Sequence, residues 1–163
     1  MSQEIWKERR ELENEYGNRI WIQGVGGNYA AEVLSNFLPA GTNQESINET
    51  KRLVTLANTK YPNTPVVQVA TGTAVVGNAL TELGPPIQGQ VKGAVLFGYT
   101  KNLQNNGRIP NYPVESTRVY CESLDAVCFG TLFILPAHFL YADEARMEAP
   151  RFLISQISIN QDK

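Results

Sequence analysis

The 163-residue sequence has few side chains that bind metal ions through sulfur or nitrogen. It contains two cysteines, Cys121 and Cys128, and one histidine, His138. A structural zinc site normally takes four such ligands, so we expect no metal site, and no motif leads us to expect a cofactor. The two cysteines could form a disulfide that closes a short loop or remain free thiols in a reducing compartment, and their spacing does not decide between these.

Long apolar runs and an excess of one charge are also missing. No stretch approaches the roughly 18 apolar residues that a membrane span needs. Residues 1–17 are charged throughout and offer no apolar signal region, so we expect no secretory signal in this chain. The formal net charge of -2 gives no electrostatic reason to bind a phosphate backbone. We therefore expect no nucleic-acid partner and no transmembrane segment.

The composition is that of a folded chain, with 42% hydrophobic and 18% charged residues. Its length predicts one domain over residues 1–163. Strand-like and helix-like patterns alternate along it. Strands are predicted at 19–23, 66–70, 91–98 and 117–123. Helices are predicted at 3–16, at 73–83, at 147–159, and from a capping box at Thr42 and Glu45 to about residue 59.

This alternation predicts an α/β fold, a three-layer α/β/α sandwich with a mainly parallel central sheet. Residues 99–113 are rich in Asn, Gly and Pro and predict a long loop. Gly24 and Gly26 match the first two glycines of a dinucleotide-binding fingerprint. Tyr29 occupies the third position, where a side chain blocks close packing, so a sharp turn is the favoured interpretation.

Two residues near the end of the chain could carry acid–base chemistry. His138 follows an apolar run, where a packed structural histidine is the commoner case. Asp125 lies thirteen positions earlier, between the two cysteines. An aspartate followed by a histidine is the order in which α/β hydrolases use these residues after their serine. The corner "VATGTAVV" at 69–76 has the strand-to-helix form of a nucleophile elbow, yet it contains no serine.

Four segments resemble the fungal cutinases, small secreted serine esterases of the α/β-hydrolase fold. These are "WIQGVGG", "FGYTKNLQNNGRIPNYP", "CESLDAVC" and "PAHFLYADEARMEAPRFL", and the resemblance runs from about residue 16 to about 159. It implies hydrolysis of lipophilic esters, including the cutin polymer, by a serine, histidine and aspartate triad. It also implies a secreted protein, which we expect to be a monomer.

The resemblance assigns roles to individual residues. His138 matches the triad histidine, which takes the proton of the nucleophile, and Asp125 matches the aspartate that orients it. Cys121 and Cys128 match the cysteines of the loop around that aspartate, which implies a disulfide. An apolar cleft that holds the acyl chain is implied at Leu38, Leu132, Phe133 and Leu135.

The sequence departs from the family at the nucleophile. The family motif is G-Y-S-Q-G, but this chain is two residues shorter between the neighbouring landmarks. The best remaining match puts Ala70 at the serine position and leaves the backbone N–H of Thr71 as an oxyanion donor. The family's first strand, which supplies another oxyanion donor, has no counterpart here, and Tyr61 replaces a family cysteine. A degenerate copy is favoured over a wrongly assembled gene model.

Three hypotheses for function follow. The first is a cutinase-like ester hydrolase homologue that is weak or inactive because its nucleophile and part of its oxyanion hole are missing. The second is a non-catalytic protein that binds cutin or lipid surfaces through residues 129–136. The third is an enzyme that uses the Thr71 hydroxyl in an unusual geometry.

Overall fold

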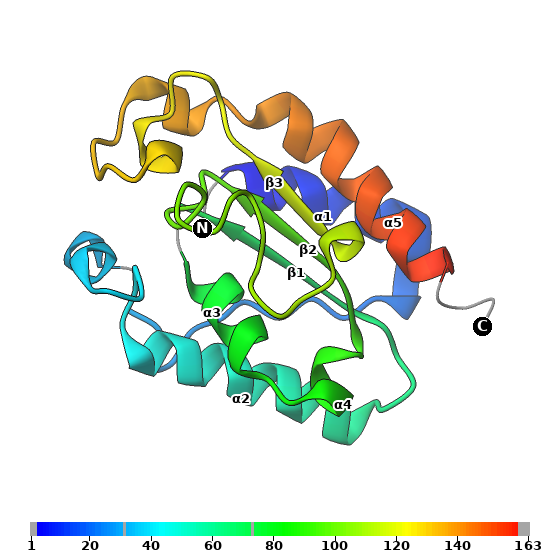
Figure 1. The fold of residues 1–163 in the computed structure, drawn as a ribbon. Coiled ribbons are helices and arrows are strands. Elements are labelled where there is room, and N and C mark those ends of the chain that lie inside the picture. Colours follow the sequence, from blue (N-terminus) through cyan, green and yellow to red (C-terminus); the bar gives the residue numbers. More distant parts are fainter. Residues whose placement is uncertain (1–2, 31, 73, 160–163) are drawn as a thin grey trace.

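A three-stranded parallel sheet forms the centre of the protein. The computed structural model describes residues 3–30, 32–72 and 74–159, and within them the strands are β1 (Val66–Thr71), β2 (Val91–Phe97) and β3 (Thr117–Tyr120). Their spatial order is β1-β2-β3, and both neighbouring pairs are parallel. The carboxyl ends of all three strands therefore meet at one edge of the sheet (Figure 1).

Helices cover both faces of this sheet, as Figure 1 shows. The α-helices are α1 (Gln3–Tyr16), α2 (Gln44–Lys60), α3 (Val75–Glu82), α4 (Pro85–Gln88) and α5 (Ala149–Ile159). Short 3-10 turns connect the elements at η1 (Gly17–Arg19), η2 (Val33–Phe37), η3 (Val114–Ser116), η4 (Ala126–Phe129) and η5 (Pro136–Phe139). One π-helical turn, η6 (Glu144–Glu148), leads directly into α5.

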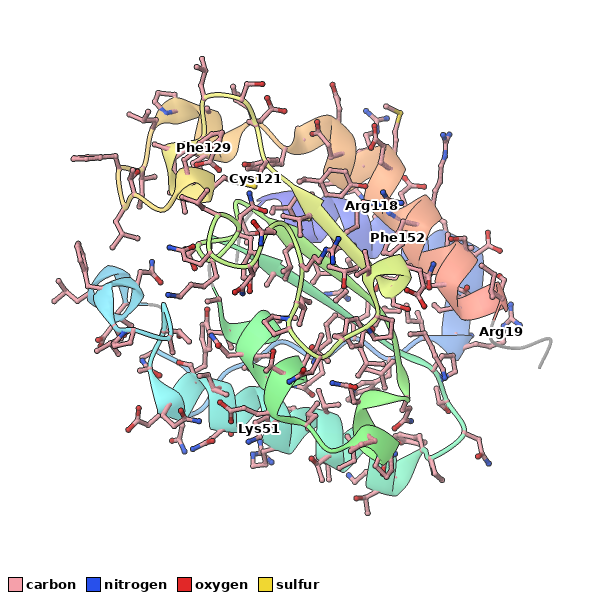
Figure 2. All side chains as sticks on the ribbon, viewed as in Figure 1. Arg19, Lys51, Arg118, Cys121, Phe129 and Phe152 are labelled. Atoms are coloured by element: carbon pink, nitrogen blue, oxygen red, sulfur yellow. A yellow bond between two sulfur atoms is a disulfide. The ribbon has the colours of Figure 1, made fainter. Side chains whose placement is uncertain are left out.

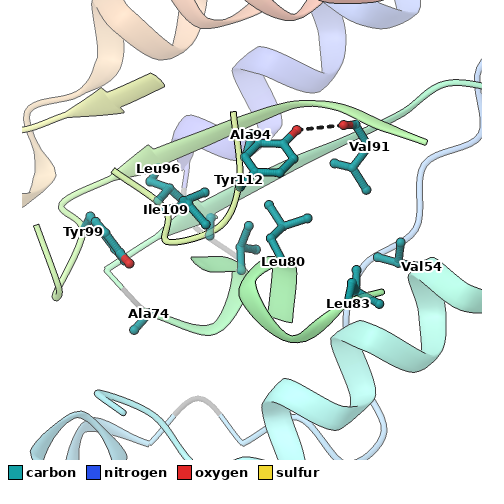
Figure 3. Packing of buried hydrophobic residues seen from close by; sticks show 12 residues of the cluster. Val54, Ala74, Leu80, Leu83, Val91, Ala94, Leu96, Tyr99, Ile109 and Tyr112 are labelled. Carbon is teal, nitrogen blue, oxygen red and sulfur yellow. Dashed lines mark hydrogen bonds between the residues drawn. The ribbon is translucent and has the colours of Figure 1, made fainter. Parts of the chain in front are cut away.

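Alternate side chains of β2 point to opposite faces and build two separate cores. Ala94 and Leu96 face α2 and α3, where Leu80 is among the buried side chains. Figure 3 shows this core, in which the Tyr112 hydroxyl also donates a hydrogen bond to the Val91 carbonyl at 2.8 Å. Val95 and Phe97 face α1 and α5. This two-sided burial explains why the strand is an unbroken apolar run.

The prediction of an α/β fold with a parallel sheet and helices on both faces is confirmed, but the predicted strand at 19–23 is wrong. Residues 20–23 form no regular element after η1. Ile20 packs against the α5-side core, whereas Trp21 is 80% exposed and Ile22 also faces solvent. The segment carries strand-type residues, but a strand also needs a hydrogen-bonded neighbour, which a local pattern cannot reveal.

Other boundaries shift by a few residues. Asn43 rather than Thr42 caps α2, because the Asn43 side chain accepts a hydrogen bond from the Ser46 N–H at 2.8 Å. Thr42 is buried instead. The helix predicted at 73–83 is confirmed as α3. Its predicted first residue, Thr73, lies outside the described residues. The last strand ends at Tyr120, immediately before Cys121.

Candidate active site

Two glycines end the neighbouring strands β1 and β2 and bring the backbone close to a histidine. The Gly72 N–H donates to the Phe97 carbonyl at 2.8 Å, and the Gly98 N–H donates to the Tyr120 carbonyl at 2.9 Å. Each glycine thus continues the hydrogen bonding of the sheet by one residue. Both have positive φ angles, +63° for Gly72 and +56° for Gly98, which glycine adopts at no steric cost. The chain can therefore turn sharply at the carboxyl edge.

A disulfide-closed loop follows β3 and carries the buried Asp125. Cys121 and Cys128 are bonded (Figure 2 labels Cys121), so the disulfide reading of this pair holds in the structure. Asp125 is fully buried and caps η4, where its Oδ1 atom accepts a hydrogen bond from the Val127 N–H at 3.1 Å. The cap and the covalent closure together hold the carboxylate in one orientation.

His138 lies in η5 and faces this carboxylate. Its Nδ1 atom is 2.9 Å from Oδ2 of Asp125. Because a carboxylate only accepts hydrogen bonds, the imidazole donates through Nδ1–H. The opposite ring nitrogen, Nε2, faces the end of β1, since a Cβ atom on Gly72 would lie 2.8 Å from it. A histidine held this way can accept a proton at Nε2 while the aspartate stabilises the resulting charge.

A tyrosine that the sequence reasoning missed completes the polar cluster. The hydroxyl of Tyr141 donates to Oδ2 of Asp125 and accepts a hydrogen bond from the Glu122 N–H at 3.1 Å. Burial, and next the hydrogen bond to Asp125, raise the pKa of Tyr141 well above its ordinary value, so the phenol stays protonated. The only signal in the sequence is its position three residues after the histidine.

The residues predicted at the nucleophile position lie within β1. Ala70 pairs with Leu96 and is buried in the core on the α3 side. Thr71 is the last residue of the strand and pairs with Phe97. The residue that faces Nε2 is the next one, Gly72. No serine occurs anywhere in 65–80.

Two separate segments of the chain, one around η2 and one before η5, lie toward the carboxyl edge of the sheet in Figure 1. Leu38 follows η2, where the Lys101 ammonium donates to the adjacent Pro39 carbonyl at 2.6 Å. The residues predicted for the second flank precede η5, where Phe133 and Leu135 are exposed and Leu132 is partly buried. The second segment leads directly into η5, which carries His138.

The described residues include no group of three or more His, Cys, Asp and Glu side chains that could hold a metal ion. Among the helices of the same residues, none has both the length and the apolar character to cross a bilayer. A parallel sheet with an aspartate–histidine pair at its carboxyl edge is the arrangement of an α/β hydrolase. Comparison with known proteins narrows this class to one family.

The chain belongs to the cutinase family, because the family model described as Cutinase matches residues 7–157. It is 60% identical over 148 residues to cutinase CUT1 of Pyricularia oryzae, covering 90% of this chain and 65% of that protein. It is 44% identical over 149 residues to cutinase 1 of Fusarium vanettenii, with 90% and 65% coverage. The chain therefore spans just under two thirds of the length of these relatives.

A solved structure of similar fold is a Trichoderma reesei cutinase in complex with a C11Y4 phosphonate inhibitor. The TM-score is 0.79 at 26% sequence identity, and the match covers 93% of this chain and 66% of that one. The cutinase fold is therefore present over nearly all of this chain.

Proposed function

We propose that this chain is a cutinase-type ester hydrolase homologue that retains the aspartate and histidine of the triad and lacks its nucleophilic serine. The observation that carries the proposal is the 2.9 Å contact between His138 Nδ1 and Asp125 Oδ2, with Nε2 directed to the end of β1. In this role His138 is the general base and Asp125 holds its tautomer. The substrates are lipophilic esters of the cutin class.

Gly72 is the residue that we propose at the nucleophile's place in space. Counting residues between landmarks leads to Ala70, but that side chain is buried inside β1. A nucleophile elbow is a strained turn after the strand. Gly72 has the positive φ of such a turn and the contact with Nε2. Under this assignment the two missing residues belong to the turn after β1, and the elbow carries no side chain.

An elbow without a hydroxyl leaves little catalysis. Removing the serine of such a triad lowers turnover by a factor on the order of 10⁶, because only binding and oxyanion stabilisation remain. The backbone N–H of Thr71, the donor assigned by the sequence register, belongs to the last residue of β1. We therefore expect ester hydrolysis that is weak or undetectable, and a Thr71→Val variant with the same rate.

A fluorophosphonate probe tests this proposal directly, since it labels activated serines. The purified chain is incubated with excess probe and analysed by intact mass, with hydrolysis of a short-chain p-nitrophenyl ester measured in parallel. We expect an unmodified mass and no hydrolysis above that of His138→Ala. Stoichiometric labelling, or hydrolysis that depends on His138, would refute the loss of the nucleophile.

The alternative is a non-catalytic protein that attaches to cutin or lipid surfaces. The observation that favours it is the exposure of apolar side chains in residues 129–140, which we call the apolar segment. Phe133 is 73% exposed, and Phe139 and Leu140 are each 63% exposed. These side chains are not core, so they remain available to a hydrophobic surface. Failure to partition onto a cutin or wax film would exclude this function.

Both functions are extracellular ones. We therefore propose that the protein acts outside the cell, as the resemblance implies, and that it acts as a monomer.

A further inference from the structure

Oδ2 of Asp125 accepts two hydrogen bonds, and only one of them comes from the histidine. His138 Nδ1 is one donor at 2.9 Å, and the Tyr141 hydroxyl is the other. Oδ1 is separately occupied by the Val127 N–H. The imidazole and the phenol therefore compete for the electron density of a single carboxylate oxygen.

The phenol is held in place from three sides. Its oxygen accepts the Glu122 N–H at 3.1 Å, which leaves the hydroxyl proton free to donate only toward Asp125. The ring packs against Phe97 with centroids 5.7 Å apart. The Tyr141 carbonyl accepts the Ala145 N–H at 2.9 Å at the start of the last helical segment. Tyr141 is 1% exposed, so water does not replace the phenol as a donor.

No other side chain offers Oδ2 a proton in the described part of the site. The Cys128 sulfur lies 3.8 Å from Oδ2 and 3.9 Å from the phenol oxygen, but a disulfide sulfur carries no proton. The charges that act on the phenol are the carboxylates of Asp125 and Glu122, and both favour its neutral form.

We propose that Tyr141 is a positioning residue that limits the hydrogen bond between Asp125 and His138. The inference rests on the proposed role of His138 as the base. A donor to a carboxylate stabilises its charged form and weakens its attraction for a second proton. With the phenol in place, Oδ2 shares its charge between two donors, so its hydrogen bond to Nδ1 of the imidazole is weaker. Without it, Asp125 holds the imidazolium more strongly.

Tyr141→Phe tests the proposal, because it removes the hydroxyl and keeps the ring. The chain has a single histidine, so its imidazole resonances are unambiguous in an NMR titration. We expect the titration midpoint of His138 to lie at a higher pH in the variant than in the native protein. The Nδ1–H proton should also move downfield, since its hydrogen bond becomes stronger.

Tyr112→Phe is the matched control. Tyr112 is also a buried tyrosine, and its hydroxyl donates to the Val91 carbonyl far from the carboxylate. The control should lose a comparable hydrogen bond and leave the histidine titration unchanged. An unchanged or lower midpoint in Tyr141→Phe, or the same rise in both variants, would overturn the proposal.

A second substitution covers the case in which Tyr141→Phe does not fold. Incorporation of 3-fluorotyrosine at position 141 keeps the hydroxyl and makes it a stronger donor, so the midpoint of His138 should fall. A rise or no change would contradict the proposal. Neither measurement requires ester hydrolysis. The proposed hydrolase function could therefore fail its labelling test while the limiting role of Tyr141 stands, and the reverse is equally possible.

Discussion

Gly72 lies so close to His138 that a Cβ atom on the glycine would stand 2.8 Å from Nε2 of the imidazole. Gly72 directly follows the last residue of β1, whereas Ala70 is paired within the strand and buried in the core. Serine substitutions at the two positions therefore differ in what they can restore.

Gly72→Ser should create a hydroxyl beside the base, whereas Ala70→Ser should not. The first substitution places a side chain at positive φ, which costs about 1–2 kcal/mol, and the imidazole must move by some tenths of an ångström. The second buries an unpaired hydroxyl at a cost of about 1–3 kcal/mol. We expect fluorophosphonate to label Gly72→Ser and not Ala70→Ser, measured by intact mass.

Gly72→Ala is the control, because it introduces the same strain without a hydroxyl. If Ala70→Ser were labelled and Gly72→Ser were not, the register obtained by counting residues would be correct and the assignment of Gly72 would be wrong.

Asp125 and His138 could be found in the sequence because each lies in a local pattern, a cysteine-bounded loop and a family-like segment. Tyr141 could not, since its hydrogen bond to Asp125 spans sixteen residues and exists only when the disulfide loop folds back. The elbow is a further case. Counting residues between landmarks leads to Ala70, whereas the proposed assignment of Gly72 depends on its backbone angle and on its contact with Nε2, neither of which the sequence shows.

The fold was predictable where burial dictates residue type. β2 is apolar because both of its faces are covered, so its sequence alone indicates a parallel sheet. The false strand at 19–23 shows the limit of this reasoning. Trp21 and Ile22 favour extended structure, but pairing depends on a neighbour elsewhere in the chain, and both side chains are left in solvent.

Gly98→Ala should disrupt the Asp125 and His138 pair. A Cβ at this position would lie 2.5 Å from Cε1 of His138 and 2.9 Å from Oδ2 of Asp125, and the loop that carries them is closed by the disulfide. Overpacking of this kind costs about 1–3 kcal/mol. We expect the free energy of unfolding, measured in urea, to fall by that amount. The cost of placing an alanine at positive φ adds to it.

Gly17→Ala isolates the contribution of the backbone angle. Gly17 has the same φ of +56°, and a Cβ there meets nothing within 4 Å. Equal destabilisation by the two substitutions would show that the close contacts at Gly98 carry no cost.

Reduction of the disulfide should lower the thermal stability. The bond joins two cysteines that are seven positions apart in the sequence. The chain entropy lost by closing a loop of this length stabilises the fold by about 2–3 kcal/mol. For a chain of this size the melting temperature should fall by about 5–10 °C. Calorimetry with and without reductant measures the change. A Cys121→Ala, Cys128→Ala variant should be insensitive to reductant. An unchanged melting temperature in fully reduced native protein would contradict the expectation.

Stability should decline above about pH 10 because three tyrosines are buried. Burial raises the pKa of Tyr99, Tyr112 and Tyr141 above the ordinary value of 10.0. Above that pH these three tyrosines ionise in the unfolded chain but stay protonated in the folded chain. Their contribution to the free energy of unfolding is therefore fully present below pH 10 and is lost as the pH rises.

Tyrosinate absorbance and circular dichroism, recorded together, should show these three groups ionising only as the fold is lost. Tyr61→Phe, at an exposed position, should leave the alkaline transition in place. Ionisation of all seven tyrosines near pH 10 with the fold intact would contradict the burial argument.

Surface attachment, if it occurs, should depend on the apolar segment. Phe133 and Phe139 lie on either side of the η5 proline and expose most of their rings, so each can bury apolar area against a wax or cutin film. Phe133→Asp with Phe139→Asp removes that area and adds two negative charges. We expect the bound fraction in a film-partitioning assay to fall at least about tenfold, since burial of one such ring is worth about 1.5–3 kcal/mol.

Val114→Asp with Leu56→Asp adds the same charge at exposed apolar positions elsewhere and should bind like the native chain. Equal loss in both double variants would mean that net charge, and not the apolar segment, governs attachment.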